Sequence, residues 1–411
     1  MSFELQEANL GHFLNFKNGK SSPDRSDDSA YPVFGSNGII GRSEKTNCTA
    51  NTIVIGRVGS YCGSVHFSEE KCWVSDNAIS CTTKKFGEEL FWFYFLERLN
   101  LNQFSSGSGQ PLLNQATLNS VECIVPADSD VRIDIGNILR SFDRKISLNT
   151  QTNQTLEAMA QAIFKSWFVD FDPVKAKMNG EQPQGMDEAT ASLFPDKLVE
   201  SELGLIPEGW SVCTLSNLVD LIGGGTPKRS EKAYWGGEIP WFSVKDVPSG
   251  SDVFVVDTDE KITELGLSKS STKLLKKGTT IITARGTVGK LALVGTDMCM
   301  NQSCYGIRGK EVGDYYNYFN LNEAVSTLQQ NTHGAVFDTI TTKTFDTYSM
   351  AFSGVELANR FDEIIAPLLQ KIESNVRQNI ELSALRNTLL PKLLSGEIEL
   401  SNAEDLVEVS A

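Results

Sequence analysis

The chain has 411 residues, of which 40% are hydrophobic and 22% charged, and its formal net charge is −15. This length is enough for two or three domains that each bury a core, and the composition is that of an ordinary globular protein. There is no run of about 18 apolar residues, and the N-terminus MSFELQEANL lacks the shape of a signal peptide, so we expect no membrane span and a cytoplasmic location. The acidic charge counts against a nucleic-acid partner, because DNA binding usually leaves a basic footprint.

The acidic charge extends over every region of the chain. Residues 1–130, 131–208, 209–353 and 354–411 carry net charges of −5, −4, −1 and −5. Any binding to DNA would therefore need basic groups clustered on one face, or phosphate attraction supplied by partner subunits.

Cysteine and histidine are too scattered to indicate a metal site. The eight cysteines form no CxxC pair, and there are only three histidines. A zinc site needs closely spaced ligands, so we expect no bound metal and interpret the cysteines as small buried or free thiols.

Residues 1–130 mix short β-branched runs with turns rich in glycine, asparagine and serine. This pattern predicts a mixed α/β domain that is rich in strands. Residues 131–169 follow as a long helix with a narrow 4-3 hydrophobic stripe, typical of a coiled-coil seam. The stripe comprises Ile135, Leu139, Phe142, Ile146, Asn149, Asn153, Leu156, Ala160, Ile163 and Trp167.

Residues 170–208 contain four prolines and several glycines, and indicate an irregular connector. Residues 209–353 then repeat the pattern of the first stretch, with a period near 227 residues. The likeness is loose and confined to turns and strand edges. It pairs Thr52–Val54 with Thr280–Ile282, Arg57 with Arg285, Asp76–Asn77 with Asn301–Gln302, and Ser106–Gly109 with Asn331–Gly334.

Residues 354–396 form a second long helix that matches the first without gaps at an offset of 226, and residues 397–411 form an acidic tail. The second stripe comprises Phe361, Ile365, Leu368, Ile372, Asn375, Asn379, Leu382, Arg386, Leu389 and Leu393. Each helix would be about 57–60 Å long, and we predict that the two pair antiparallel because a long domain separates them. Pro367 should kink the second helix or mark its true start.

The asparagines in the two stripes allow two interpretations. They control register if they are buried against one another, because a buried asparagine pairs best with another asparagine. Otherwise these positions rotate out to solvent.

Two like domains on one long spacer form a pseudo-two-fold α+β fold, with two strand-rich domains separated by an antiparallel coiled coil. DNA is itself nearly two-fold in shape, and dimeric proteins use that match to read two half-sites about 34 Å apart, or a multiple of that distance. A chain with two diverged domains could read two different half-sites. The same duplication would equally suit a scaffold that holds two proteins.

Specific motifs favour the first possibility. The central run is Ala162-Ile-Phe-Lys-Ser-Trp-Phe-Val-Asp-Phe-Asp-Pro173, with Leu193–Asp196 and Ser201–Trp210 beyond it. The other matching motifs are Phe34–Gly41, Gly224–Pro227, Ile239–Trp241 and Leu389–Ile398. With these motifs, nearly the whole chain resembles the specificity subunit of type I restriction-modification systems.

The resemblance implies two target-recognition domains that read the two halves of an asymmetric bipartite DNA sequence. It implies partners as well: double-stranded DNA, two methyltransferase subunits and two restriction subunits. S-adenosylmethionine, ATP and Mg²⁺ would belong to those partners, and this chain would be non-catalytic and hold no cofactor.

Motifs for catalysis are missing from the sequence. There is no [DN]PP[YF] element for methyl transfer, and Ala284–Leu291 lacks the first glycine and the Ser/Thr of a phosphate-binding loop. Glu69-Glu70-Lys71 lacks a nearby upstream acidic partner for nuclease chemistry. A self-contained restriction enzyme is therefore disfavoured, and a scaffold that does not bind DNA remains the main rival.

For DNA contact we expect polar and basic side chains in turns, where they can reach grooves and phosphates. The candidates are Asn37, Arg42, Arg57, Ser60, Ser108 and Gln110 in the first domain, and Thr226, Lys228, Arg229, Lys245, Arg285, Lys290 and Gln302 in the second. Trp235 and Trp241 could stack near a groove, but packing in the core is favoured. The candidates for partner binding are Trp167, Phe168, Phe171, Leu393 and Leu394, near the helix ends; packing within the helix pair is the alternative.

Overall fold

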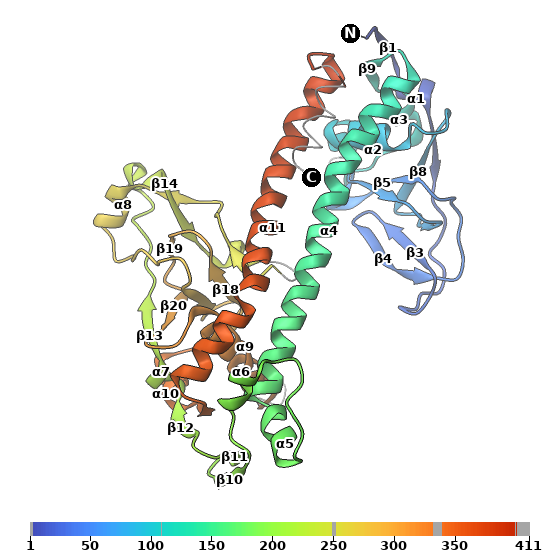
Figure 1. The fold of residues 1–411 in the computed structure, drawn as a ribbon. Helices are drawn as coiled ribbons and strands as arrows, with labels where there is room; N and C mark the ends of the chain where they lie inside the picture. The colour runs from blue at the N-terminus through green and yellow to red at the C-terminus, as the bar shows by residue number, and fades with distance from the viewer. Residues whose placement is uncertain (1–2, 108, 249–251, 332–338, 399, 401–411) are drawn as a thin grey trace. The chain divides into compact units, whose positions relative to one another are not determined.

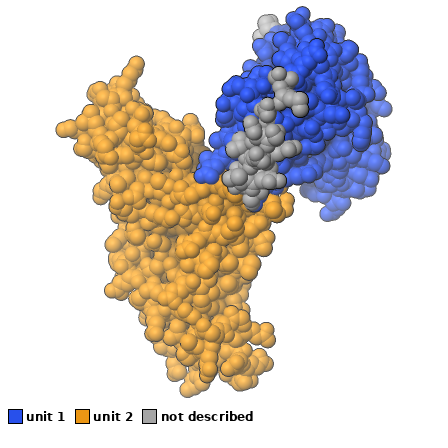
Figure 2. Space-filling model, turned by 45° about the horizontal axis from the view of Figure 1, so that its top comes forward, with its two compact units in different colours: residues 1–146, 380–411 blue, residues 147–379 orange. Residues whose placement is uncertain are grey.

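The computed structural model describes residues 3–107, 109–248, 252–331, 339–398 and 400. The chain divides into two compact units, which Figure 2 colours separately: unit 1 is residues 1–146 and 380–411, and unit 2 is residues 147–379. Two long helices, α4 (Ser129–Phe168) and α11 (Val355–Ser395), each contribute one part to unit 1 and the other to unit 2. Both units therefore contain a globular stretch and a piece of each helix (Figure 1).

Unit 1 contains three small sheets, whose strand orders are β1-β9, β2-β8-β5-β6 and β4-β3-β7. The strands are β1 (Leu5–Asn9), β2 (Leu14–Asn18), β3 (Tyr31–Gly35), β4 (Gly38–Ser43), β5 (Thr52–Gly56), β6 (Val65–Ser68), β7 (Trp73–Val74), β8 (Ala78–Thr83) and β9 (Glu122–Pro126). All pairings are antiparallel except β3 with β7, which run parallel.

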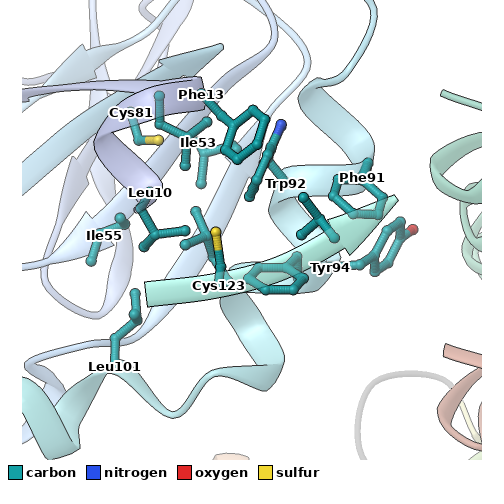
Figure 3. Packing of buried hydrophobic residues seen from close by; sticks show 14 of the residues in the cluster. Leu10, Phe13, Ile53, Ile55, Cys81, Phe91, Trp92, Tyr94, Leu101 and Cys123 are labelled. Atoms are coloured by element: carbon teal, nitrogen blue, oxygen red, sulfur yellow. The ribbon is translucent and has the colours of Figure 1, made fainter. Parts of the chain in front are cut away.

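Among the described residues, three α-helices and two 3-10 helices complete the globular part of unit 1, and one of them carries most of the aromatic core. They are α1 (Leu10–Phe13), α2 (Glu89–Arg98), α3 (Gln115–Ser120) and the 3-10 helices η1 (Gly59–Tyr61) and η2 (Leu101–Phe104) beside them. Helix α2 is apolar around most of its surface, and Phe91, Trp92 and Tyr94 are fully buried (Figure 3). They pack against Ile53 and Ile55 of the central strand β5 and against both long helices.

Unit 2 repeats this arrangement with additional strands. Its strand orders are β10-β11, β12-β21, β13-β20-β17-β18-β15 and β16-β14-β19. The strands are β10 (Leu198–Ser201), β11 (Gly204–Pro207), β12 (Ser211–Thr214), β13 (Val219–Gly223), β14 (Trp235–Phe242), β15 (Phe254–Val255), β16 (Lys261–Ile262), β17 (Thr280–Thr283), β18 (Leu291–Val294), β19 (Cys299–Met300), β20 (Cys304–Gly309) and β21 (Ser349–Phe352). Its helices include α5 (Asp172–Met178), α6 (Glu188–Ser192), α7 (Leu215–Leu218), α8 (Glu264–Ser268), α9 (Asp314–Asn331) and α10 (Thr342–Thr347).

The strand pairings show that the two units share one topology. The ladder β2-β8-β5-β6 matches β13-β20-β17-β18, the pair β1-β9 matches β12-β21, and β3 parallel to β7 matches β14 parallel to β19. Segments 170–208, which the sequence predicts to be an irregular connector, contain two short helices and the β10–β11 hairpin. The expected duplicated α+β fold with two long helices is confirmed.

The ladder register corrects the alignment of the two central strands by one residue. In β8, Cys81 faces Ile53; in β20, the corresponding residue Ile307 faces Thr280. Ile53 therefore corresponds to Thr280, and the offset between the two strands is 227. The sequence likeness had paired Thr52 with Thr280. Because side chains alternate across a sheet, a shift of one residue exchanges the two faces. The corrected offset places Ile55 and Ile282 on the same face, where Ile55 packs in the cluster that contains α2 and Ile282 packs in the cluster that contains α9.

Within each unit, α4 and α11 lie side by side and antiparallel, as predicted (Figure 1). In unit 2, the amide of Asn375 donates to Asn153 at 2.9 Å, and Asn149 donates to Asn379 at 2.9 Å. In unit 1, Arg386 bonds Asp143. The two asparagine pairs share one antiparallel register, and since Asn149, Asn153 and Asn375 are at most 5% exposed, the register interpretation of the asparagines is confirmed and the solvent-facing one is wrong for these three.

Pro367 does not mark the start of the second helix, which is one of its two predicted effects; the other, a kink, stays a prediction. Helix α11 runs from Val355 through Pro367 to Ser395, and Pro367 lies on its exposed side. The stripe also turns by one residue here, because Leu369 is fully buried while the predicted Leu368 is half-buried. A straight α-helix has 3.6 residues per turn, so a strict 4-3 pattern drifts relative to its buried face.

The globular part of unit 1 is anchored to α4 by a buried ion pair. Arg132 donates to the Glu88 carboxylate at 2.6 Å, and Ser129 and Trp92 donate to the same carboxylate at 2.6 and 2.9 Å. In unit 2 the long helices use a different contact, in which Asp362 of α11 accepts from the backbone N–H of Tyr316 at 2.5 Å near the start of α9. Burial raises the pKa of Asp362 to about 6, against the effect of the two backbone N–H groups that bond it.

We predict that replacing one asparagine of the buried pair is worse than replacing both. Asn375→Leu should lower the stability of unit 2 by about 1–3 kcal/mol, because the side-chain oxygen of Asn153 is left buried without its donor. Adding Asn153→Leu should restore part of that loss, because it removes the unpaired oxygen but also the bond from Asn153 to Asp252. Gln154→Ala, on the exposed side of α4, is the matched control and should leave the urea midpoint unchanged. Equal midpoints for the single and double variants would contradict the register role.

Candidate nucleic-acid interface

Several turns of unit 1 converge at one end of its sheets, which we call the loop end of unit 1. It comprises residues 36–37, 57–64, 75–77 and 109–112. The strands β3 and β7 run parallel, so their carboxyl ends lie together, and β5 leads to the same end because it pairs with the start of β8. Backbone hydrogen bonds join the turns: Arg57 N–H donates to Asn77 at 2.9 Å, and Gly59 N–H donates to Pro111 at 3.1 Å.

Ser36 is the residue at which these turns meet. Its hydroxyl donates to the carbonyl of Asn77 at 2.5 Å and accepts from Val58 N–H at 3.4 Å, while its carbonyl accepts from the Ser64 hydroxyl. His66 lies beneath, 3.2 Å from the Ser64 hydroxyl, and burial lowers its pKa.

Four of the residues predicted to contact DNA in the first domain lie at this loop end. Asn37, Ser60 and Gln110 are exposed. Arg57 is half-buried and donates to the carbonyl of Asp76 at 3.3 Å, and its Nε has no partner among the described residues. Ser108 and part of its predicted counterpart, 332–334, lie outside the described residues.

Arg42 does not lie with the other candidates. It pairs with Pro32 in the β3–β4 hairpin, several residues away from the turn that carries Asn37. Its guanidinium donates to the carbonyls of Ser29, at 2.7 Å, and Ala30, and forms an ion pair with Glu70 at 3.4 Å. These bonds hold the hairpin and place Arg42 outside the loop end, while its contact with DNA stays a prediction.

The loop end of unit 2 is built from the corresponding turns, residues 224–227, 243–246, 284–290 and 301–303. Thr226 donates to the side chain of Gln302, and Gly225 N–H donates to Met300 at 2.9 Å. Lys245 follows the carboxyl end of β14, and the last residue of that strand, Phe242, accepts from Asn301 N–H at 2.9 Å. The side chains of Lys245, Arg285, Lys290 and Gln302 are exposed, so this end presents three cations to solvent.

The side chain of Arg229 is bound by Glu260 and Trp235 of the same unit. It forms two hydrogen bonds with the Glu260 carboxylate, and its guanidinium lies 4.0 Å from the ring centre of Trp235. The bonds to Glu260 raise the pKa of Arg229 and lower that of Glu260. Trp241 is 2% exposed and donates to Gly225 at 3.0 Å, so packing, as favoured from the sequence, is confirmed for this ring. The neighbouring Lys228 is exposed.

Each loop end contains a glycine that packs directly against a backbone oxygen, and the likeness between the two halves of the sequence did not reveal this pair of glycines. A Cβ on Gly19 would lie 2.0 Å from the carbonyl oxygen of Ser75, and one on Gly224 would lie 1.8 Å from that of Asn301. Ser75 and Asn301 occupy corresponding positions. The N–H of Ser75 donates to Phe34 of β3, and the N–H of Asn301 donates to Phe242 of β14, both at 2.9 Å. Only glycine allows this approach. Gly224 begins the motif Gly224–Pro227 of the family resemblance, but Gly19 belongs to no such motif.

Three of the predicted partner-binding residues are used inside the chain. Trp167 and Phe168 are 4% and 8% exposed in the core of unit 2, and Leu393 is 0% exposed in the core of unit 1. This burial agrees with the alternative of packing within the chain, and a direct contact of these residues with a partner stays a prediction. Phe171 and Leu394 are half-buried, and their role stays a prediction.

No group of three or more His, Cys, Asp or Glu side chains that could hold a metal ion occurs among the described residues. Over the same residues, no helix has the length and apolar character needed to span a membrane.

Comparison with known proteins identifies the family. The model of the type I restriction modification DNA specificity domain matches residues 4–158 and 207–381, which include most of each globular stretch. The chain is 28% identical over 330 residues to the HindI specificity subunit of Haemophilus influenzae, covering 70% of this chain and 71% of that protein. It is 24% identical over 329 residues to the MjaIX specificity subunit of Methanocaldococcus jannaschii, covering 76% and 69%.

The fold is also found among solved structures. The crystal structure of a type I restriction-modification S subunit from M. genitalium matches with a TM-score of 0.63 at 16% identity, over 95% of this chain and 96% of that one. The chain therefore belongs to the family of type I restriction-modification DNA specificity subunits.

We predict that Gly19→Ala and Gly224→Ala each destabilise their own unit by about 1–3 kcal/mol, because the added methyl group meets a backbone oxygen that cannot move away cheaply. The neighbouring Gly223→Ala is the matched control, since nothing lies within 4 Å of its Cβ position. Thermal unfolding measures the three variants. If all three kept the wild-type midpoint, the close approach would not constrain the loop ends.

Proposed function

We propose that the two units read the two halves of an asymmetric, bipartite DNA target, each with its own loop end. Membership of the specificity-subunit family supports a role in DNA recognition. The observation that carries the proposal is the shared topology of the units, combined with different chemistry at corresponding positions of their loop ends. One fold used twice with different side chains would give two different half-sites.

The corrected register shows how far the loop ends differ. Arg57 N–H donates to Asn77 and its carbonyl accepts from Leu113, whereas Ala284 makes the same two contacts with Ser303 and Ile340. Arg57 therefore corresponds to Ala284, and not to Arg285 as the sequence likeness suggested. Asp76 likewise corresponds to Gln302 and not to Asn301. A carboxylate accepts hydrogen bonds only, while a carboxamide both donates and accepts, so these positions would favour different base edges.

The chain itself has the role of aiming partner enzymes, in this proposal, and carries out no reaction. Two methyltransferase subunits would supply S-adenosylmethionine chemistry, and two restriction subunits would use ATP and Mg²⁺ in the cytoplasm. With a net charge of −15, the chain needs partners that contribute to phosphate attraction if it is to bind DNA, and these subunits would contribute it. The two long helices would set the length of the unspecified gap between the half-sites.

Methylation mapping tests the proposal. The chain is expressed with its cognate methyltransferase subunit in a host without DNA methylation, and methyladenine is mapped by single-molecule sequencing. We expect one asymmetric motif with two short specified blocks around a fixed gap. If a purified, stable complex of the two subunits produced no new methylation, the acidic charge would instead favour a scaffold that does not bind DNA.

Salt dependence separates DNA-contacting cations from structural ones. In the complex with the methyltransferase subunit, Arg285→Ala or Lys290→Ala should each lower the slope of log K against log salt by about 1, with an unchanged unfolding midpoint. Lys276→Ala is the control, because Lys276 is also exposed but forms an ion pair with Asp297 and belongs to none of the turns of the loop end. Its slope should stay at the wild-type value. A loss as large as that of Arg285→Ala would show that charge acts without regard to position.

A further inference from the structure

Two cysteines of unit 1 lie directly opposite one another. Cys48 and Cys72 form an isolated antiparallel bridge in which Cys48 N–H donates to Cys72 at 3.0 Å and Cys72 N–H donates to Cys48 at 3.3 Å. Residues paired in this way have Cα atoms about 5.5 Å apart, inside the range of about 4.4–6.8 Å that a disulfide requires. Both thiols are free, Cys72 is fully buried and Cys48 is half-buried.

The duplicated fold shows that thiols are not needed at this position. In unit 2 the corresponding bridge joins Leu275 to Met298, with N–H to carbonyl distances of 2.7 and 3.1 Å. Met298 and Cys72 each immediately precede the short strand that lies parallel to β14 or β3. Leu275 and Met298 are fully buried, so two apolar side chains satisfy the same packing.

Cys48 also differs in acidity from every other cysteine of the chain. The hydrogen bond from the Cys72 thiol, with smaller contributions from Ser80, Lys17 and Lys20, lowers the pKa of Cys48 to about 7 against the opposing effect of burial. The same contact raises the pKa of Cys72, and burial raises the pKa values of the six other thiols. A thiolate is the nucleophilic form of cysteine, so Cys48 combines partial exposure with the reactive state.

We propose that Cys48 and Cys72 are a redox modification site, at which a peroxide oxidises the two thiols to an intrachain disulfide. The Cys48 thiolate attacks one oxygen of hydrogen peroxide, the O–O bond breaks, and hydroxide leaves, giving a sulfenic acid at Cys48. Cys72 then attacks the Cys48 sulfur, forms the S–S bond and expels the sulfenic oxygen as hydroxide. The two thiol protons neutralise the two hydroxides, so two thiols and one peroxide give one disulfide and two waters.

The disulfide would act on the strand that leads into the loop end of unit 1. Next to Cys48, the Asn47 amide already holds β7, since it donates to the Val74 carbonyl and accepts from the Val74 N–H at 2.9 and 2.8 Å. Ser75, Asp76 and Asn77 follow directly. Oxidation would therefore tie residues 47–48 covalently to β7 in unit 1 alone, because unit 2 has leucine and methionine at the equivalent bridge.

The test uses the purified full-length chain, titrated with hydrogen peroxide at pH 7 and digested without reduction. We expect a cross-linked peptide that joins Cys48 to Cys72 and lacks two hydrogens relative to the reduced peptides. Cys72→Ser should give no cross-link and a sulfenic acid at Cys48 that dimedone traps. Cys213→Ser is the control, because Cys213 is the other half-buried thiol, and should leave the cross-link unchanged.

Two further measurements keep the outcome decisive. Cys48 should react with iodoacetamide roughly ten times faster than Cys213 at pH 7, as its lower pKa requires. The double variant Cys48→Leu with Cys72→Met, which copies the bridge of unit 2, should fold and show no peroxide-dependent change in unfolding midpoint. The proposal is overturned if peroxide oxidises any of the other six thiols before a Cys48–Cys72 cross-link forms. It is also overturned if the cross-link appears only in urea.

Discussion

The antiparallel register of α4 and α11 is the constraint on which both units depend. Neither unit has a complete core without a piece of each helix, since Phe142 and Leu389 pack in unit 1 while Phe164 and Phe361 pack in unit 2. A slip along the seam would remove the buried Asn153–Asn375 pair and displace apolar side chains from both cores at once. A polar pair of this kind specifies register because a mismatched asparagine is left buried without a partner.

The side chains that join the long helices to the globular part differ between the two units. Unit 1 joins α2 to both helices through Tyr94, Asp143 and Arg386, in which the tyrosine hydroxyl donates to Asp143 at 2.5 Å. At the repeat offset of 226, Asp143 and Arg386 correspond to Leu369 and Ala160, which are fully buried in an apolar part of unit 2. The helices thus keep one backbone arrangement while each unit secures its own globular part with different chemistry.

Sequence reasoning reached the helices, their antiparallel pairing and the duplicated α+β fold, because a gapless 4-3 pattern extends over many turns. It failed where the alignment of two strands differs by one residue and where one distant partner determines the place of a side chain. The match of Thr52 to Thr280 was attractive by identity, yet only the hydrogen-bonded ladder reveals that Ile53 is the true counterpart. Arg42 and Arg229 looked like Arg285 in the sequence, but ion pairs with distant residues, Glu70 and Glu260, separate them from it. Such long-range partners leave no local signal.

The central claim is that each loop end specifies its own half of the target, and mapping methyladenine for paired variants tests it most directly. One variant carries Asn37→Ala with Gln110→Ala in unit 1, and the other carries Thr226→Ala with Gln302→Ala in unit 2, each expressed with the methyltransferase subunit. The account predicts that the first variant relaxes the specified bases of one block only and the second relaxes the other block only. Relaxation of both blocks by either variant, or of neither block by both, would contradict it.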